Sequence, residues 1–373
     1  MSLWPSSITL DGVAIALAGV VADVVVHRGR DSVSAEPTAD TCQMTFHDVA
    51  KAFVDAFDVG QSLVLNVRDG AGPELPRFAG RITDASLDDD ELTVIGAGLL
   101  STLRGFEIGA SSWPAEAWSA RVTRVFTEAG LASLLELHAD PTFDPLISAR
   151  DSATAGTTTL ADYLAFLAPM IGALVADKPD GGIVVQAIGA RRLEDEVELA
   201  PADVAYVPRW EEERPAGNIV TVRYQADQGA SVTVQDDASI GRYGERPVTI
   251  DTAFQNASDA TTRAQTALTR GAYSHWTMPS APILRGLDLK LGVPVVVSSL
   301  PPAAPHDPWT PVVEGWTDTI TGDDWTMELA LSDPLVSGLA LPWDAIPVAD
   351  LWTTIDQATA WADALTLDDL EAA

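Results

Sequence analysis

Histidine is the side chain best suited to acid–base catalysis and zinc binding near neutral pH, and this chain has five. They are His27, His47, His138, His275 and His306. None belongs to a His-Glu-x-x-His motif or to another short-spaced zinc pair. His138 and Asp140 flank a predicted loop, so we interpret His138 as a solvated loop residue. The histidines therefore predict no metal site.

Other catalytic signatures are also missing. The sequence has no Gly-x-Ser-x-Gly nucleophile elbow and no phosphate-binding loop. Gly96 and Gly98 resemble a dinucleotide motif, but its third glycine is absent. Acidic residues are numerous enough for a glycosidase pair, yet nothing singles out two of them. We expect a protein that is not an enzyme and has no cofactor; a cell-wall hydrolase with unassigned carboxylates is the weakest alternative.

Two acidic runs have simple structural interpretations. The run 88–91, DDDE, lacks the alternating acids and central glycine of a calcium loop, which favours an exposed hairpin turn. The run 211–213, EEE, is typical of a solvated charged segment.

Length and composition set the broad class of protein. A chain of 373 residues predicts two or three domains. No stretch approaches the roughly 20 uninterrupted apolar residues of a membrane helix, and the start, MSLWPSS, shows no signal peptide. Cys42 is the single cysteine, so an intrachain disulfide is excluded and folding in a reducing cytoplasm is expected.

The charge is strongly negative. Three Lys and 19 Arg face 54 acidic residues, giving a net charge of −32, and residues 291–373 hold 14 acids and no Lys or Arg. This balance argues against specific nucleic-acid binding and against docking on anionic membranes. Solubility explains it simply; a surface that must not adhere to DNA passing nearby is the sharper interpretation.

The first hundred residues favour antiparallel β-structure, because short alternating or β-branched segments are separated by turn residues. The expected strands are 20–27, 43–46, 62–67, 77–85 and 91–97.

The pattern then changes to helices. Helical spacing of apolar residues predicts a helix within 112–130, with Ser112 as cap and Pro114 in the first turn. A second is predicted over 159–175, where Pro169 should cause a kink or an early end. With a following strand at 183–187, this indicates a small mixed domain.

In the rest of the chain, expected strands alternate with expected helices. Strands are expected at 219–224, 232–235, 287–297, 311–320 and 325–331. A helix is expected at 258–271 and an acidic amphipathic helix at 350–370.

An internal repeat relates two of the β-rich segments. Residues 59–67, VGQSLVLNV, match 291–299, LGVPVVVSS. Further on, Gly80 in GRITDASLDDDELTV is matched with Gly315 in GWTDTITGDDWTM. We interpret the halves as two related β-barrels; chance similarity between β-rich segments is the alternative. A ring of three such chains would present six similar modules.

Five stretches carry a family resemblance. They are VVVHRGRDSVSAEPTADTCQMTFHD, RFAGRITDASLDDDELTVIGAGLLSTLRG, SSWPAEAWSARVTRVFTEAGL, ASIGRYGERPVTIDTAFQNASDATTRAQTALTRGAYSHW and VVEGWTDTITGDDWTMELALSD. In this order, over roughly 20–335, the chain resembles minor tail or tail-hub proteins (baseplate-hub-like) of long-tailed actinobacteriophages.

The resemblance implies an α+β, β-rich fold of two antiparallel β-barrels with an intervening α/β domain and a helical insertion. The boundaries would be 1–108 for the first barrel, 109–204 for the α/β domain, 205–238 with 285–338 for the second barrel, 239–284 for the insertion, and 339–373 for an acidic helical tail. It also implies a homotrimer that contacts a distal tail or tail tube protein ring, the tape measure protein, and tip or fibre proteins.

Late tryptophans suggest where such contacts lie. Trp is enriched at protein interfaces, although core packing explains many single tryptophans. The short acidic tail offers little else to bury against, so its apolar residues are the candidate interface: Trp343, Trp352, Ile355, Trp361 and Leu365.

The sequence thus predicts a structural virion protein at the tail tip, assembled in the host cytoplasm. As tail hub, it would adapt the six-fold tube to the tip and line the DNA exit channel, without membrane insertion. The alternatives are a receptor- or glycan-binding tail-tip module, with tryptophans as a stacking platform, and the hub of a contractile injection device.

Overall fold

The computed structural model describes most of the chain up to residue 333 and two short segments beyond it. The described residues are 5–15, 21–32, 36–68, 73–151, 158–193, 195–199, 204, 209–225, 229–278, 280–284, 287–300, 304, 308–321, 324–333, 341–342 and 364–365. Of the described residues, 45% are in strands and 22% in helices, which confirms a β-rich α+β class. No helix in the described ranges has the length and apolar character needed to cross a membrane.

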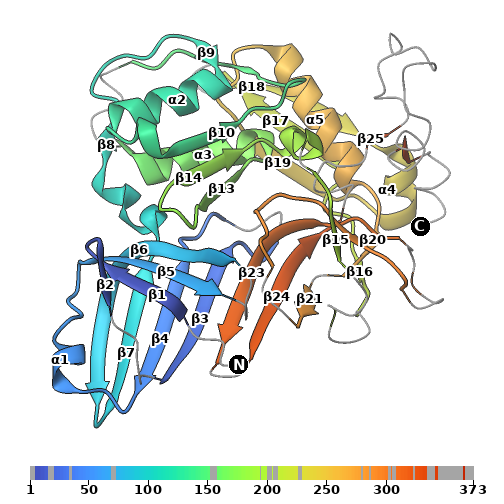
Figure 1. The fold of residues 1–373 in the computed structure, drawn as a ribbon. Coiled ribbons are helices and arrows are strands. Elements are labelled where there is room, and N and C mark those ends of the chain that lie inside the picture. The colour runs from blue at the N-terminus through green and yellow to red at the C-terminus, as the bar shows by residue number, and fades with distance from the viewer. Residues whose placement is uncertain are drawn as a thin grey trace.

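One ten-stranded antiparallel sheet forms the lower half of Figure 1. Side by side, its strands are β2 (Val13–Ile15), β1 (Pro5–Leu10), β5 (Ser62–Arg68), β6 (Glu74–Asp88), β7 (Glu91–Ala97), β4 (Thr41–His47), β3 (Val21–Gly29), β23 (Val312–Ile320), β24 (Trp325–Ser332) and β21 (Ser280–Ile283). Segments some 290 residues apart therefore meet where β3 pairs with β23.

Alternating side chains give this sheet one buried face. Along β4, Cys42, Met44 and Phe46 are buried while the residues between them face outward. Their cluster continues into the other half of the sheet, where it includes Trp316 and Trp325. The first and last strands of the sheet thus share a single hydrophobic core.

A second core lies in the upper body of Figure 1. It is built from α2 (Trp118–Glu128), α3 (Leu160–Ile171), α5 (Ala257–Gly271), the sheet β10 (Leu135–His138), β14 (Ile183–Gln186) and β13 (Leu174–Asp177), and the sheet β18 (Ala230–Gln235), β17 (Ile219–Tyr224) and β19 (Pro247–Asp251). Small elements complete the described chain: α1 (Lys51–Val54), α4 (Asp237–Tyr243), η1 (Leu99–Gly105), η2 (Ala132–Leu134), η4 (Ile188–Leu193), β8 (Glu107–Ile108), β9 (Glu116–Ala117), β11 (Leu146–Ile147), β12 (Thr158–Thr159), β15 (Val197–Leu199), β16 (Glu211–Glu213), β20 (His275–Thr277), β22 (Val295–Val297), β25 (Leu341–Pro342) and β26 (Ala364–Leu365).

The helices begin and end for local reasons. The first starts later than predicted, because residues 116–117 pair with β11 as strand β9 before α2 begins. The second is capped by Thr159 and ends at Gly172 in the left-handed conformation, three residues after Pro169. Leu174, predicted to continue that helix, instead begins strand β13. The predicted third helix is confirmed as α5.

The grouping of later segments differs from the predicted domains. Strands β17 and β18 were assigned to a second barrel, but Val220 and Val222 pack with α5 in the upper core. Strand β21, predicted to lie in the helical insertion, pairs with β24 in the large sheet. Of the predicted helical tail, the described residues 364–365 form a two-residue strand with 341–342, and the rest lies outside the described residues.

The repeated segments share the same local structure. Gly60 and Gly292 both have positive φ, 94° and 76°. The Gly60 amide donates to Ile82 O at 2.8 Å, and the Gly292 amide donates to Val313 O at 2.7 Å. In each case a β-bulge directly follows the residue that accepts this hydrogen bond. The bulge lies at Thr83 in β6 and at Glu314 in β23. Strands β5, β6 and β7 therefore correspond to β22, β23 and β24.

This register corrects one detail of the predicted repeat. Because Ile82 corresponds to Val313, Gly315 corresponds to Asp84, and the predicted match of Gly80 with Gly315 is wrong. As the next neighbours of β7 and β24, β4 and β21 also correspond. The large sheet has β2 and β21 as its edges, so this strand order does not confirm two closed barrels.

The bulge residue Glu314 joins the sheet to the upper body. Its buried carboxylate accepts from Arg30 Nε at 2.8 Å, from Arg191 Nη1 at 2.6 Å and from Ser332 Oγ at 2.6 Å. Burial alone would raise the pKa of Glu314, but the charges of Arg191 and Arg30 lower it to about 2. The carboxylate is therefore ionised and held by Arg30 just after β3, Arg191 of η4 and Ser332 of β24.

We predict that Glu314→Gln destabilises the fold by about 3–5 kcal/mol, because two guanidinium groups would then be buried without a counter-charge. Urea unfolding at pH 7 measures the difference. Glu328→Gln, on the exposed face of β24, is the control and should change stability by less than about 0.5 kcal/mol. Equal stability of Glu314→Gln and the wild type would contradict this assignment.

Candidate functional site

The predicted interface residues cannot be placed together. Trp343, Trp352, Ile355 and Trp361 lie outside the described residues. Leu365 lies in β26, where its backbone pairs with Pro342. The structure therefore leaves this predicted interface as a hypothesis.

Most of the earlier tryptophans are core residues. Trp309, Trp316 and Trp325 are buried. The indole N–H groups of Trp316 and Trp325 donate to the buried Asp318 carboxylate, at 2.9 and 2.8 Å. A glycan-stacking platform needs exposed rings, so these three side chains do not provide one.

The residues first considered for chemistry are engaged in local contacts. His138 Nε2 lies 2.8 Å from Glu136 Oε1 on the surface of β10. The acidic run 88–91 is the exposed turn between β6 and β7, as predicted, and 211–213 is exposed as strand β16. Within the described ranges no group of three or more His, Cys, Asp or Glu side chains could hold a metal ion.

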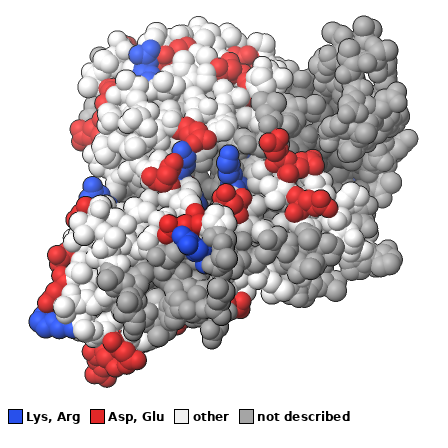
Figure 2. Space-filling view, in the orientation of Figure 1, with Lys and Arg blue, Asp and Glu red and all other residues white. Residues whose placement is uncertain are grey.

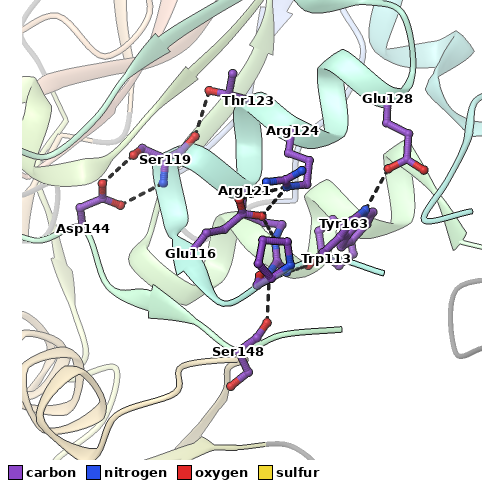
Figure 3. Close-up of polar contacts among 11 residues, drawn as sticks. Trp113, Glu116, Ser119, Arg121, Thr123, Arg124, Glu128, Asp144, Ser148 and Tyr163 are labelled. Carbon is purple, nitrogen blue, oxygen red and sulfur yellow. Dashed lines mark hydrogen bonds and ion pairs between the residues drawn. The ribbon is translucent and has the colours of Figure 1, made fainter. Parts of the chain in front are cut away.

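Polar and aromatic side chains around α2 pack together and hold this helix in place (Figure 3). Two guanidinium groups lie over the Trp113 ring, with Arg121 Cζ 5.2 Å and Arg150 Cζ 4.9 Å from its centroid. Its N–H donates to Glu128 Oε2 at 2.9 Å, and Tyr163 packs edge-on at 5.1 Å. The motif SSWPAEAWSAR thus positions α2 against α3.

Arg121 is the most connected member of this cluster. It is buried, and it donates to Glu116 Oε1 at 2.7 Å, Tyr163 Oη at 2.8 Å, and the carbonyls of Pro114 and Ser148 at 2.8 and 3.0 Å. Burial would raise the pKa of Glu116, but hydrogen bonds from Arg124 and Arg121 lower it. These contacts pair the charged groups with one another, so no bound substrate is needed to balance them. The cluster therefore stabilises the fold.

A second buried ionic group lies between the large sheet and the upper body. Arg28, at the end of β3, donates to Asp40 Oδ2 at 2.8 Å and to Asp177 O at 3.0 Å. The Asp177 carboxylate accepts the Asp40 and Leu100 amides at 2.9 and 2.8 Å. These backbone and side-chain contacts of Arg28, Asp40 and Asp177, called the seam below, fix β13 against β3.

Asp177 is the acid of this seam that titrates near neutral pH. Burial, and then the neighbouring Asp40 charge, raise the pKa of Asp177 to about 7. Burial also raises the pKa of Asp40, against the influence of Arg28. The charges of the seam are therefore best balanced when Asp177 is protonated and Arg28 is paired with the Asp40 carboxylate.

Solved structures share this fold, whereas no protein-family profile and no curated protein matches the chain. The 43 kDa tail protein of prophage MuSo2 from Shewanella oneidensis superposes with a TM-score of 0.59 at 15% identity, covering 91% of this chain and 99% of that one. The tail protein from Neisseria meningitidis MC58 gives 0.59 at 13% identity, covering 89% and 98%.

This chain has the fold of those phage tail proteins. An E. coli component of the type VI secretion system, described as similar to the T4 bacteriophage tail proteins gp27 and gp5, gives a TM-score of 0.50 at 11% identity, covering 88% and 77%. The first two likenesses extend over nearly the full length of both chains, so the shared fold includes the large sheet and the upper body together.

The features that the sequence did not reveal are the two buried ionic groups that join the large sheet to the upper body. Arg28, Arg30 and Asp40 lie close in the sequence, but Asp177, Arg191 and Glu314 join them from distant segments. The one available signal was the arginine-rich turn HRGR, which places two guanidinium groups at the end of an apolar strand.

We predict that the free energy of unfolding of the wild type decreases as pH rises from 5 to 8. This decrease should exceed that of Asp177→Asn by on the order of 2 kcal/mol. The sign follows because the folded state keeps a proton on Asp177, up to a pKa of about 7, that the unfolded chain releases near 3.8. Urea unfolding across this range measures it. Asp180→Asn, at an exposed acid on the next turn, should keep the wild-type pH profile; parallel profiles for all three proteins would contradict the prediction.

Proposed function

We propose that this protein is a structural tail hub at the distal end of a phage tail tube. The observation that carries the proposal is the likeness in fold to two phage tail proteins over nearly the whole of each chain. The packed, internally paired ionic groups support a structural role, and the proposal includes no catalysis.

The repeated strand unit supports a ring of three chains. In each half a strand that follows a positive-φ glycine lies beside a strand with a bulge at the same register, so three chains would present six similar modules to a six-fold tube. Further pairings support a barrel-like second module: the Val295 amide donates to Pro311 O, and Val204 bridges to Ile283. The two-barrel architecture is part of this proposal.

The acidic surface supports a channel that DNA crosses without adhering. In Figure 2, separate groups of Asp and Glu are scattered over a face that is otherwise mostly uncharged, with fewer Lys and Arg among them. A net charge of −32 repels phosphate, so nothing favours specific nucleic-acid binding. In the virion, the partners would be a distal tail or tube ring, the tape measure protein, and tip or fibre proteins.

The hub of a contractile injection device is the second candidate. The likeness to the E. coli type VI secretion component favours it, although at a lower TM-score than the two tail proteins. The same ring would serve in both devices, so the two candidates differ in their partners and share the assembly.

We predict that the purified, untagged protein forms a trimer of 39.4 kDa chains as its concentration rises, because each chain supplies two of six modules. Light scattering across a concentration series measures the mass. A stable hexamer, or a monomer at every concentration, would contradict the three-chain ring.

We predict no retention of duplex DNA at low salt, where phosphate contacts are strongest. Filter binding at about 20 mM and about 200 mM salt measures this, with a basic DNA-binding protein as the positive control. Tight retention that weakens as salt is added would count against a DNA channel lined by this chain.

A further inference from the structure

One face of the large sheet is open through both of its halves. Strands β7, β4, β3, β23, β24 and β21 lie side by side (Figure 1), and their inward side chains are buried in the core. Gln43 lies opposite Val25 of β3, and Val25 lies opposite Thr319 of β23, so the outward side chains continue across the joint between the halves. We call these side chains the open face; each is exposed or half-buried, and they are the outward ones within 23–27, 41–47, 91–97, 280–282, 317–319 and 326–330.

A second layer lies on the other side of the sheet in each half. In the first half it is formed by β1 and β5, which turn Ile8 and Leu65 into the core. In the second half it is formed by β22, through Val295 and Val297. This layer makes each half thicker on its core side. Because the outside of a ring has the longer circumference, a ring of such halves fits best with the core side outward and the open face toward the axis.

The number of strands gives the size of the opening. Residues 84–88 of β6 pair with β7 and with no described strand on their other side, so seven strands border the open face in each chain. With about 4.8 Å between strands and a barrel-like tilt of about 40°, three copies would enclose a bore of roughly 40 Å between backbones. Such a bore admits one DNA duplex after space is left for the side chains.

The side chains of the open face suit the passage of DNA. No Lys or Arg belongs to it, and its carboxylates are those of Asp23, Glu91 and Glu328. Its commonest residue is threonine, at Thr41, Thr45, Thr93, Thr317, Thr319 and Thr326. Proteins hold phosphate groups mainly with Lys and Arg, so a wall of hydroxyls and a few carboxylates does not retain a polyanion.

Arginines of the same sheet are engaged within the protein. Arg28 of β3 and Arg77 of β6 are buried and lie over tryptophan rings in the core. Arg81 of β6, at the border of the open face, donates to Gly60 O at 2.9 Å. The sheet thus uses these guanidinium groups for its own packing and keeps them off the open face.

The histidines of the open face lie beside acids. His47 Nε2 is 3.3 Å from Asp23 Oδ2, and His47 Nδ1 is 3.2 Å from Glu91 Oε2. His27 Nε2 is 3.8 Å from Asp31 Oδ1. A proton on either ring would therefore meet a carboxylate and would not create an unpaired cation on this face.

We propose that the open face lines the channel of the hub and that duplex DNA slides along it without binding. The inference deepens the proposed hub and rests on it, because the ring supplies the channel. It adds which side of the sheet DNA meets, and it assigns the core side and its second layer to the outside of the ring.

Spin labels in the assembled ring test which side faces the axis. Gln43→Cys places a label on the open face, and Ala14→Cys, opposite the outward Thr9 of β1, places one on the other side of the core. The native Cys42 is buried and should not react. Pulsed electron paramagnetic resonance of the trimer should give a shorter distance between labels at 43 than between labels at 14.

The outcomes separate this inference from the hub itself. A trimer in which the labels at 43 are as far apart as those at 14, or farther, rejects the open face as the channel wall and leaves the ring intact. A protein that forms no trimer rejects both the ring and the channel wall.

Added cations provide a second measurement. Gln43→Lys combined with Thr319→Lys should raise the retention of linear duplex DNA at low salt at least about tenfold, because each lysine can contact a phosphate. A closed circular duplex cannot thread a preformed ring and should be retained less. The matched control, Thr9→Lys combined with Ala14→Lys, adds the same charge on the other side of the core and should behave as the wild type does. Unchanged retention, or an equal gain in the control, would contradict the proposal.

Discussion

The buried carboxylate of Glu314 is the constraint on which the arrangement of this protein depends. A charge removed from water is tolerated only when its partners are all in place. Here the partners come from the residue after β3, from η4 and from β24. Arg30 therefore fixes the pairing of β3 with β23, which makes one sheet out of two halves. Arg191 attaches the upper body to the same point, and the Arg28 seam attaches it a second time.

The same bulge explains how two similar modules acquire different roles. In β23 the bulge residue is Glu314, which anchors β3 through Arg30. In β6 the corresponding residue is Thr83, whose hydroxyl donates to Ile95 O within the hairpin. Without a buried acid, the β6 bulge has nothing to hold a neighbouring strand from its own chain. One substitution between the repeats thus distinguishes a closed edge from an open one.

The sequence predicted the elements better than their grouping. Alternation identified β4, β5 and β7, and the positive-φ glycines Gly60 and Gly292 identified the start of each repeat unit. The alternation of apolar and polar residues shows which side chains are buried, but not which part of the protein covers them. Strands β17 and β18 were therefore assigned to the wrong neighbours. The Gly80 match failed because a bulge adds a residue that changes the register without changing the composition. Partners such as Asp177 and Glu314 depend on the tertiary fold and leave no local signal.

The placement of arginine makes the surface more acidic than the composition suggests. Among the described basic residues, five are buried: Arg28, Arg30, Arg77, Arg121 and Arg191. Their charges offset buried acids or lie over tryptophan rings, so they do not neutralise the exterior. Two copies of such a chain repel one another over most of their surface. Association between copies is therefore expected only at surfaces whose buried apolar area offsets this repulsion.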